Sequence, residues 1–319
     1  MTVTLALAGD TMLGRRVAEK LAVQPPSSLF SPEVVDVARE ADLFVLNLEC
    51  CISERGSRWP DPAKPFFFRA PPSAVEALAL LGVDCVTLAN NHALDYGEEA
   101  LLDTLEHLQD AGIAWVGAGA DLAAAQAPAV IEANGFRLGV VGVTDHPSEF
   151  AARPGGPGVA YAPLREGVPD WLRRAVRELE ADAVLITPHW GPNMVASPLP
   201  YVRAAADALV EAGATLVAGH SAHVFHGVAG RVLYDLGDFL DDYAVDPLLR
   251  NDRGLLFLVT LGERGPVRVE AVPLELEYCH TCLARGDEAA WIRRRFREAC
   301  AELGTEVSDE EGRLVVDCR

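Results

Sequence analysis

The chain has 319 residues, 27 of them basic and 47 acidic, so its formal net charge at pH 7 is −20. Half of the residues are hydrophobic, which excludes intrinsic disorder. Non-specific affinity for nucleic acid comes mainly from Lys and Arg side chains, so the acidic balance argues against a nucleic-acid partner. The nearest basic cluster, Arg293 to Arg295 with Arg297, has helical spacing and is predicted to be a solvated helix face.

Short aliphatic strands alternate with amphipathic helices from residue 1 to about residue 220. The predicted strands are nearly all apolar, as parallel strands covered on both faces are, and comprise residues 3–8, 43–48, 85–89, 115–117, 138–143, 184–187 and 216–218. The predicted helices between them comprise residues 32–41, 73–81, 98–111, 169–179 and 201–211. This alternation predicts an α/β fold.

The pattern changes after residue 220. Residues 231–236, 255–261 and 267–276 are consecutive predicted strands joined by turns, so we expect hairpins, followed by a helix at 288–303. The Gly- and Pro-rich residues 155–163 have strands on both sides, so we interpret them as a surface loop. Periodicity therefore predicts one domain with a mixed sheet.

No basic region or cleavage site precedes Asp10, and no apolar stretch reaches the roughly 18 residues that a membrane span needs. We therefore expect a cytoplasmic protein with no membrane partner. The seven cysteines are an odd number, which favours reduced thiols. Cys279 and Cys282 have zinc-knuckle spacing, but Cys300 and Cys318 lie on other predicted elements, so we favour free thiols here too.

Polar residues able to bind metals follow five of the predicted strands. In an open α/β sheet, ligand sites form at the carboxyl ends of the strands. Each residue alone has a structural explanation, such as a helix cap or a turn, but five equivalent strand endings favour one convergent site. The residues concerned are Asp10, Glu49, Asn91 with His92, His189, and His220 with His223.

These residue types suit borderline divalent ions, because imidazoles bind Zn, Fe, Co or Mn and a carboxylate can bridge two metals. Asp10 and Glu49 would contribute two negative charges, so two divalent ions would leave about +2 at the site. Such a centre would attract an anionic group and lower the pKa of bound water.

Six motifs in this order and spacing resemble the CapA-type poly-γ-glutamate capsule-synthesis family, a branch related to calcineurin-like metallophosphoesterases. The motifs are G-D-T-M-L-G-R (9–15), N-L-E (47–49), A-N-N-H-A-L-D-Y-G (89–97), H-W-G (189–191), G-H-S-A-H-V (219–224) and L-G-D-F (236–239). The resemblance implies a four-layer α/β/β/α sandwich of the metallophosphoesterase type. It implies a domain over residues 1–280, with residues 281–319 as a C-terminal helical extension packed on that domain.

The resemblance also implies roles for single residues. His92 matches the motif histidine that faces the substrate as an acid, with Asp95 or Asp10 as the carboxylate that orients it. Glu49 is the bridging ligand. The full implied ligand set for one or two divalent transition-metal ions (Mn, Fe, Zn or Co) is Asp10, Glu49, Asn91, His189, His220 and His223.

Two departures from the wider metallophosphoesterase pattern leave the number of ions open. Motif one reads Asp10-Thr11-Met12 in place of Asp-x-His, and the usual Gly-His-x-His is stretched to Gly-His-x-x-His. Around the site, Arg15 and Arg69 could clamp a phosphate or carboxylate, and His146 and His226 could line the pocket.

These features predict a metal-dependent hydrolase that acts on a small anionic substrate, either a phosphoester or a glutamyl-type amide or peptide. A metal-activated water would attack, and His92 would act as the acid. One alternative is a metal-dependent peptide Cα epimerase that uses His92 and Asp10 of the same site. A second alternative is a non-catalytic binder of an anionic polymer or peptide. The loops at residues 54–68 and 148–163 are expected to select the substrate.

Overall fold

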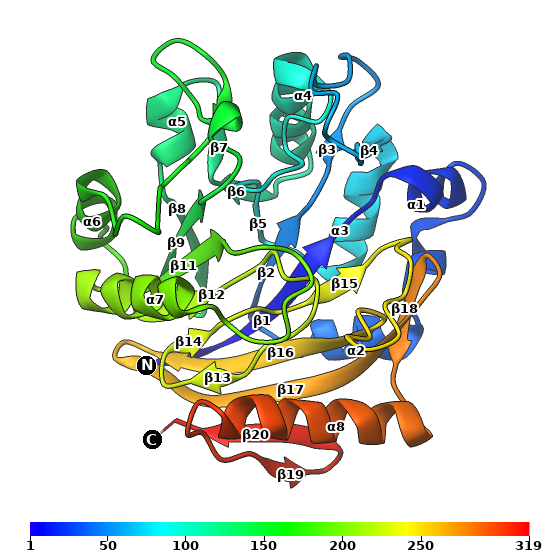
Figure 1. Ribbon diagram of the computed structural model, residues 1–319, viewed down its shortest axis with the longest axis vertical. Helices are drawn as coiled ribbons and strands as arrows, with labels where there is room; N and C mark the ends of the chain where they lie inside the picture. The colour runs from blue at the N-terminus through cyan, green and yellow to red at the C-terminus, as the bar shows by residue number, and fades with distance from the viewer. Residues whose placement is uncertain (319) are drawn as a thin grey trace.

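Two large β-sheets lie face to face in the computed structural model, which describes residues 1–318 (Figure 1). The ten-stranded sheet has the order β19-β20-β17-β16-β1-β2-β5-β6, with β15 paired to β1 and β18 to β17. The six-stranded sheet has the order β13-β14-β12-β11-β9-β8.

The strands have the following bounds. Those of the ten-stranded sheet are β1 (Thr2–Thr11), β2 (Leu43–Leu48), β5 (Cys85–Thr87), β6 (Ala114–Val116), β15 (Asp238–Leu240), β16 (Arg253–Gly262), β17 (Gly265–Glu277), β18 (His280–Leu283), β19 (Ser308–Glu310) and β20 (Arg313–Asp317). Those of the six-stranded sheet are β8 (Ala129–Ala133), β9 (Phe136–Thr144), β11 (Ala183–His189), β12 (Leu216–Ala218), β13 (Val228–Ala229) and β14 (Val232–Leu233). Two small ladders pair β3 (Cys51–Ile52) with β4 (Arg69–Ala70) and β7 (Ala118–Gly119) with β10 (Gly158–Val159).

Helices cover the outer faces of both sheets (Figure 1). The α-helices are α1 (Arg15–Leu21), α2 (Pro32–Ala38), α3 (Val75–Leu81), α4 (Gly97–Asp110), α5 (Leu122–Gln126), α6 (Asp170–Arg177), α7 (Pro200–Ala212) and α8 (Gly286–Ala301). Short 3-10 turns occur at Pro26–Leu29, Pro72–Ala74 and Ser148–Phe150. None of the helices in residues 1–318 has the length and apolar character needed to cross a membrane.

Successive side chains of each strand point to opposite faces of its sheet, and this divides the interior into three hydrophobic layers. Leu5 and Leu7 of β1 pack into the layer between the sheets, whereas Ala6 and Ala8 pack against α1 to α4 on the outer face. Val141 of β9 faces the opposite outer layer, beneath α6 and α7. Because successive strand residues point to opposite faces, nearly continuous apolar strands bury both sides of each sheet. The result is the four-layer α/β/β/α sandwich of the metallophosphoesterase type.

Most of the predicted elements of the first 220 residues are present, but two expectations for the fold were wrong. Periodicity indicated one mixed sheet, whereas the strands divide between two. Residues 231–236 were expected to form a hairpin with 255–261, but only Val232–Leu233 is a strand, and it pairs with β12 and β13 in the other sheet. Local pattern shows which residues are extended but not which sheet they join. The predicted hairpin of residues 255–261 with 267–276 is confirmed as β16 and β17.

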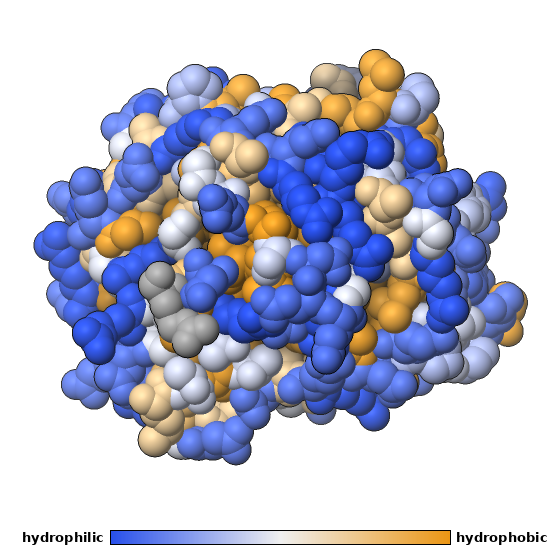
Figure 2. Space-filling model, turned by 90° about the horizontal axis from the view of Figure 1, so that it is seen from below, coloured by the Kyte–Doolittle hydropathy of each residue, from blue (hydrophilic) through white to orange (hydrophobic). Residues whose placement is uncertain are grey.

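Residues 281–318 are not a purely helical extension, because besides α8 they contribute β19 and β20 to the ten-stranded sheet. α8 buries Ile292 and Phe296 in the layer between the sheets, and β20 pairs with β17. Arg293 and Arg297 both pair with Asp309, and Figure 2 shows this lower face as largely hydrophilic with apolar patches between the charged side chains. The arginines of α8 thus belong to a solvated helix face with neighbouring acidic partners.

Gly9 lets the end of β1 approach β15 closely. A Cβ at Gly9 would lie 1.8 Å from the Gly237 carbonyl oxygen, which accepts a hydrogen bond from the Asp10 N–H. We expect Gly9→Ala to lower the free energy of unfolding by about 3 kcal/mol, because backbone rather than a flexible side chain must move. Urea denaturation measures this. The control is Gly156→Ala, whose Cβ would meet only the Arg153 side chain at 3.7 Å, and equal midpoints for the two variants would contradict the prediction.

Candidate metal centre

The carboxyl ends of strands from both sheets meet at one place. Asp10 lies at the end of β1, and the bridge between His189 and His220 joins the ends of β11 and β12. Glu49 directly follows β2 and is within electrostatic reach of Asp10 and His223. Burial lowers the pKa of His189, and the nearby charge of Asp10 opposes this shift. The structure therefore brings five of the six predicted ligands, drawn from both sheets, into one buried cluster.

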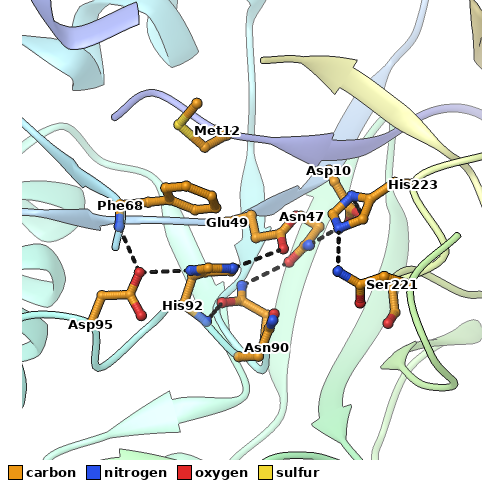
Figure 3. A network of polar contacts seen from close by, with 12 residues as sticks. Asp10, Met12, Asn47, Glu49, Phe68, Asn90, His92, Asp95, Ser221 and His223 are labelled. Carbon is orange, nitrogen blue, oxygen red and sulfur yellow. Dashed lines mark hydrogen bonds and ion pairs between the residues drawn. The ribbon is translucent and has the colours of Figure 1, made fainter. Parts of the chain in front are cut away.

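Asp10 is the most connected member of this cluster. Its Oδ1 accepts a hydrogen bond of 2.7 Å from Asn47 and lies 3.6 Å from Nδ1 of His220. Its Oδ2 lies 3.2 Å from Nδ1 of His223. Asn47 is itself held by Asn90, whose amide donates to the Asn47 side-chain oxygen at 2.9 Å (Figure 3). This chain of amides fixes the orientation of the carboxylate before any ligand arrives.

Buried atoms without hydrogen-bond partners mark where a metal would fit. Such atoms cost free energy unless something satisfies them. Both carboxylate oxygens of Glu49, Oδ1 of Asn91, both ring nitrogens of His189 and Nδ1 of His220 are buried and make no hydrogen bond. Carboxylate, amide oxygen and imidazole are the donors of divalent transition-metal sites. These side chains therefore fit the implied ions.

The electrostatics of the cluster agree with this fit. Burial lowers the pKa of His220 to about 4 and that of His189 well below its usual value, so both imidazoles are neutral, as metal ligands must be. Burial and the nearby Asp10 carboxylate raise the pKa of Glu49 well above its usual value. A cation between Asp10 and Glu49 would relieve that repulsion.

Asp238 belongs to the cluster, although we did not single it out from the sequence. Its Oδ1 lies 2.8 Å from Nδ1 of His223, and Asp10, His223 and Asp238 offer ligand atoms within 4.8 Å of one another. The residue sits at the start of β15, which pairs with β1 so that Asp238 is opposite Asp10. The L-G-D-F motif was the sequence signal for it. Asp238 supplies a carboxylate beside Asp10, where motif one has Met12 in place of a histidine.

The loop that carries His220 and His223 is held in an uncommon backbone conformation. Ser221 has φ +115° and His223 has φ +59°, a region that residues other than glycine rarely occupy. Asp235 stabilises the loop, since its carboxylate accepts hydrogen bonds from the N–H groups of Ala222 and Gly237, both at 2.9 Å. One buried carboxylate thus joins the His223 loop to the segment that carries Asp238.

His92 forms a pair with Asp95 next to the cluster. The distance from Nδ1 of His92 to Oδ2 of Asp95 is 2.6 Å, and Nε2 lies 3.7 Å from Oε1 of Glu49, so the ring lies between the two carboxylates (Figure 3). Burial lowers the pKa of His92, although the contact with Asp95 opposes this shift. Of the two carboxylates considered from the sequence, it is Asp95 that contacts His92.

Two residues that the sequence did not indicate hold this pair. The ring of Phe68 stacks on that of His92 with 3.9 Å between centroids, and the Phe68 N–H donates to Oδ2 of Asp95 at 2.6 Å. Nζ of Lys64 pairs with Oδ1 of Asp95 at 3.0 Å and donates to the Asn91 carbonyl at 2.8 Å. Both residues come from the Pro- and Phe-rich loop 60–68, whose composition gives no periodic signal.

The four substrate-binding candidates lie in different surroundings. Arg15 pairs with Asp242 at 3.1 Å, and Arg69 stacks over Tyr96. His146 holds Asp145 through Nδ1, and its ring lies 5.2 Å from that of His189. His226 is buried, and its Nε2 lies 2.8 Å from the Val195 carbonyl oxygen. His146 and Arg15 are thus the candidates near the cluster, because the Arg15 guanidinium lies 5.6 Å from the centroid of Phe68, whose ring stacks on His92. Arg69 and His226 contact Tyr96 and Val195 instead.

His226 is expected to make the protein sensitive to acid. Burial lowers its pKa from 6.5 to about 4, so between these values the unfolded chain takes up a proton that the folded chain does not. Its stabilising effect is complete above pH 6.5 and is lost as the pH falls toward 4, by about 3 kcal/mol. Metal-free protein unfolded in urea across this range should show a shallower pH dependence for His226→Gln. His280→Gln is the control, since His280 also contacts a backbone carbonyl, and equal slopes for wild type and His226→Gln would contradict the prediction.

All seven cysteines are free thiols, as expected. Burial raises the pKa of Cys279 to about 11, which disfavours the thiolate that would bind zinc. His280, between the two knuckle cysteines, contacts the Ser28 carbonyl oxygen at 2.9 Å. Within residues 1–318, the group of potential metal ligands whose atoms all lie within 4.8 Å of one another consists of Asp10, His223 and Asp238.

The two packed sheets with polar strand ends at their shared edge define a protein of the metallophosphoesterase-type fold. A solved structure described as a novel phosphatase from Mycoplasma pneumoniae shares this fold, with a TM-score of 0.52 and 14% sequence identity over 86% of this chain and 94% of that one. Residues 4–243 match the family of bacterial capsule synthesis protein PGA_cap, so the chain belongs to that family. The resemblance found in the motifs is confirmed.

Curated relatives agree with this membership. A probable polyglutamine synthesis accessory protein of Mycobacterium tuberculosis is 32% identical over 286 residues, which cover 83% of this chain and 74% of that protein. The PGA biosynthesis protein CapA of Bacillus subtilis is 27% identical over 318 residues, 98% of this chain and 81% of that protein.

Proposed function

We propose that this chain is a metal-dependent hydrolase for a small anionic substrate, either a phosphoester or a glutamyl-type amide or peptide. The observation that supports this most is the set of buried Glu49, Asn91, His189 and His220 donor atoms without hydrogen bonds, directly beside the His92–Asp95 pair. The names of the relatives, which refer to capsule and polyglutamine synthesis, favour the amide among these substrates.

The proposed metal site uses Asp10, Glu49, Asn91, His189, His220 and His223, with Asp238 as a further carboxylate. One or two divalent ions held there would supply Lewis-acid activation and lower the pKa of bound water. Imidazole, amide and carboxylate donors suit Mn, Fe, Zn or Co.

His92 would handle the proton of the leaving group. Asp95 fixes the ring through Nδ1, so Nε2 is the ring atom that faces Glu49 and the reacting group. An imidazolium at this position is stabilised by Asp95 and can donate from Nε2. Phe68 stacks on the ring, and Lys64 holds Asp95 from the side opposite the histidine, so the two residues limit its rotation.

A second reaction, epimerisation at a peptide Cα, is favoured by one specific observation. His146, whose Nδ1 is held by Asp145, lines the same cleft as Lys64, which binds the Asp95 partner of His92. Two histidine–carboxylate pairs therefore lie near this cleft. Removal of a proton on one face and its return on the other needs two such groups. His146, rather than Asp10, would then be the partner of His92.

One set of assays separates these reactions. Protein loaded with Mn²⁺, Fe²⁺, Co²⁺ or Zn²⁺ is incubated in D2O with 4-nitrophenyl phosphate, γ-glutamyl-4-nitroanilide and short glutamyl peptides. Hydrolysis releases nitrophenol or nitroaniline and stops with chelator, whereas epimerisation incorporates deuterium without cleavage. Metal binding with neither result would support the non-catalytic binder, and absence of metal binding would exclude the proposed site. The cytoplasmic location and the lack of nucleic-acid partners stay predictions.

A further inference from the structure

A cleft of about 570 Å³ opens beside the candidate metal centre, which is the size of a small-molecule site. Asn91 and His146 form its inner side, and the ring of His146 lies 5.2 Å from that of His189. Its other walls come from the two loops expected to select the substrate, around residues 59–64 and 146–150. A substrate that reacts at the metals would therefore place its remaining atoms in this cleft.

Aromatic side chains form a fixed apolar wall of the cleft. Trp59 and Phe150, one from each loop, meet edge to face with 4.8 Å between ring centroids. Phe150 is buried, and the backbone N–H of Trp59 donates to the backbone carbonyl of Asp95 at 2.8 Å. The wall is thus tied to the same residue that orients His92, so its position relative to the reacting group is set by the fold.

The lysine of the cleft already has partners. The Lys64 side chain is only 13% exposed, and its Nζ binds Asp95 at 3.0 Å and the Asn91 carbonyl at 2.8 Å and lies 5.5 Å from the centroid of the Phe150 ring. The nearby His146 holds Asp145 through Nδ1. Lys64 therefore has no free positive charge for an anionic substituent.

Two carboxylates of the cleft, in contrast, have no cationic partner among residues 1–318. Asp61 is exposed, and its Oδ1 accepts only the Ala63 N–H at 2.8 Å. Glu149 is exposed on the other loop, with a hydrogen bond of 3.3 Å from the Ser148 hydroxyl. The cleft therefore combines π faces with an excess of negative charge.

We propose that this cleft binds an apolar, positively charged arm of the substrate, such as an alkyl or aryl group that bears an amine. This rests on the proposed function for the position of the reacting end, which carries the anionic group of the substrate, while the arm is cationic. Carboxylates attract such a group, and the partly exposed ring of Trp59, which packs on buried Phe150, offers it cation–π and apolar contact. An anionic polymer would place its charges against Asp61 and Glu149 and is disfavoured here.

Three probes of similar size test the charge preference in metal-free protein: 2-phenylethylammonium, 2-phenylethanol and 3-phenylpropionate. Their dissociation constants are measured by quenching of tryptophan fluorescence, with Trp59→Phe to identify the contribution of Trp59. We expect the ammonium probe to bind about tenfold more tightly than the carboxylate probe, the size of two exposed ion pairs, with the alcohol between them.

The double variant Asp61→Asn with Glu149→Gln should reduce this preference to about onefold. The control double variant, Asp36→Asn with Glu76→Gln, changes the net charge equally on exposed faces of α2 and α3 and should keep it. Equal or tighter binding of the carboxylate, no binding of any probe, or a preference that survives in the Asp61/Glu149 variant would overturn the proposal. Because no metal or turnover is involved, a failed hydrolysis assay leaves this result unaffected.

Discussion

Replacing Asp10 with asparagine is expected to lower the affinity for the catalytic metal by at least about 100-fold and to abolish turnover. Asp10 is the carboxylate on which His220, His223 and Asn47 converge, at 3.6, 3.2 and 2.7 Å. An amide keeps the shape and the oxygen that accepts from Asn47, but it loses the negative charge that a divalent ion needs.

The same variant should destabilise the metal-free protein modestly. Burial would raise the pKa of the Asp10 carboxyl, but the contact with His223 and the nearby His189 and His220 hold it well below its usual range. The folded metal-free protein therefore favours the carboxylate over its neutral form, and asparagine removes that stabilisation. We expect Asp10→Asn to unfold in urea below the wild-type midpoint, and a midpoint at or above that of wild type would contradict this.

Metal content after equilibrium dialysis, together with the urea midpoint, checks both parts. Asp84→Asn is the matched control, because Asp84 lies at the opposite end of β5 and accepts a hydrogen bond from the Phe44 N–H. It should leave the metal content unchanged. Unchanged metal content in Asp10→Asn would remove Asp10 from the ligand set, and a large loss of stability would assign it a structural role.

Much of this centre was predictable because its ligands follow strands. Asp10, Glu49, His189 and His220 each end an apolar run, and in parallel strands the carboxyl ends meet at one edge. That argument needs no knowledge of which sheet holds which strand. The structure therefore brings these side chains together although periodicity alone indicated a single sheet and the structure has two.

Asp238, Lys64 and Phe68 were not predictable in the same way. Asp238 reaches Asp10 through β15, a strand of three residues whose pairing with β1 depends on the close approach at Gly9. Lys64 and Phe68 lie in an irregular loop, whose path is determined by hydrogen bonds to Asp95 and Asn91. Contacts made by loops depend on the completed fold, so sequence periodicity does not contain them.

The net charge of −20 predicted the preference of the site for anions only in part. From composition, the acidic surface excluded large polyanions, and two metals were expected to leave the interior favourable to anions. The cleft beside the centre shows that this reversal is local. Glu149 and Asp61 carry negative charge into this cleft, so any attraction for an anion would be confined to the cations that the ligand cluster would hold.

His92→Gln is expected to retain metal and to lower kcat by about 100- to 10,000-fold. His92 contacts Asp95 and faces Glu49 but contributes no atom to the proposed ligand set, so its loss removes proton transfer and leaves the metal site in place. Asp95→Asn should lower kcat to a comparable extent, because an amide cannot hold Nδ1–H in the same way.

The loss of kcat compared with the loss of metal content distinguishes an acid from a ligand. For each variant, kcat and KM are measured with the best nitrophenyl or nitroanilide substrate, and metal content is measured on the same protein. His107→Gln, on α4 and outside the cluster, should match wild type in both. A His92→Gln enzyme that loses metal and activity together would make His92 a ligand, and one with full activity would remove its role as an acid.

Phe68→Leu separates the orientation of His92 from its proton transfer. The variant removes the ring that stacks at 3.9 Å but keeps the hydrogen bond from the backbone N–H to Asp95. We therefore expect a smaller loss of kcat than in Asp95→Asn.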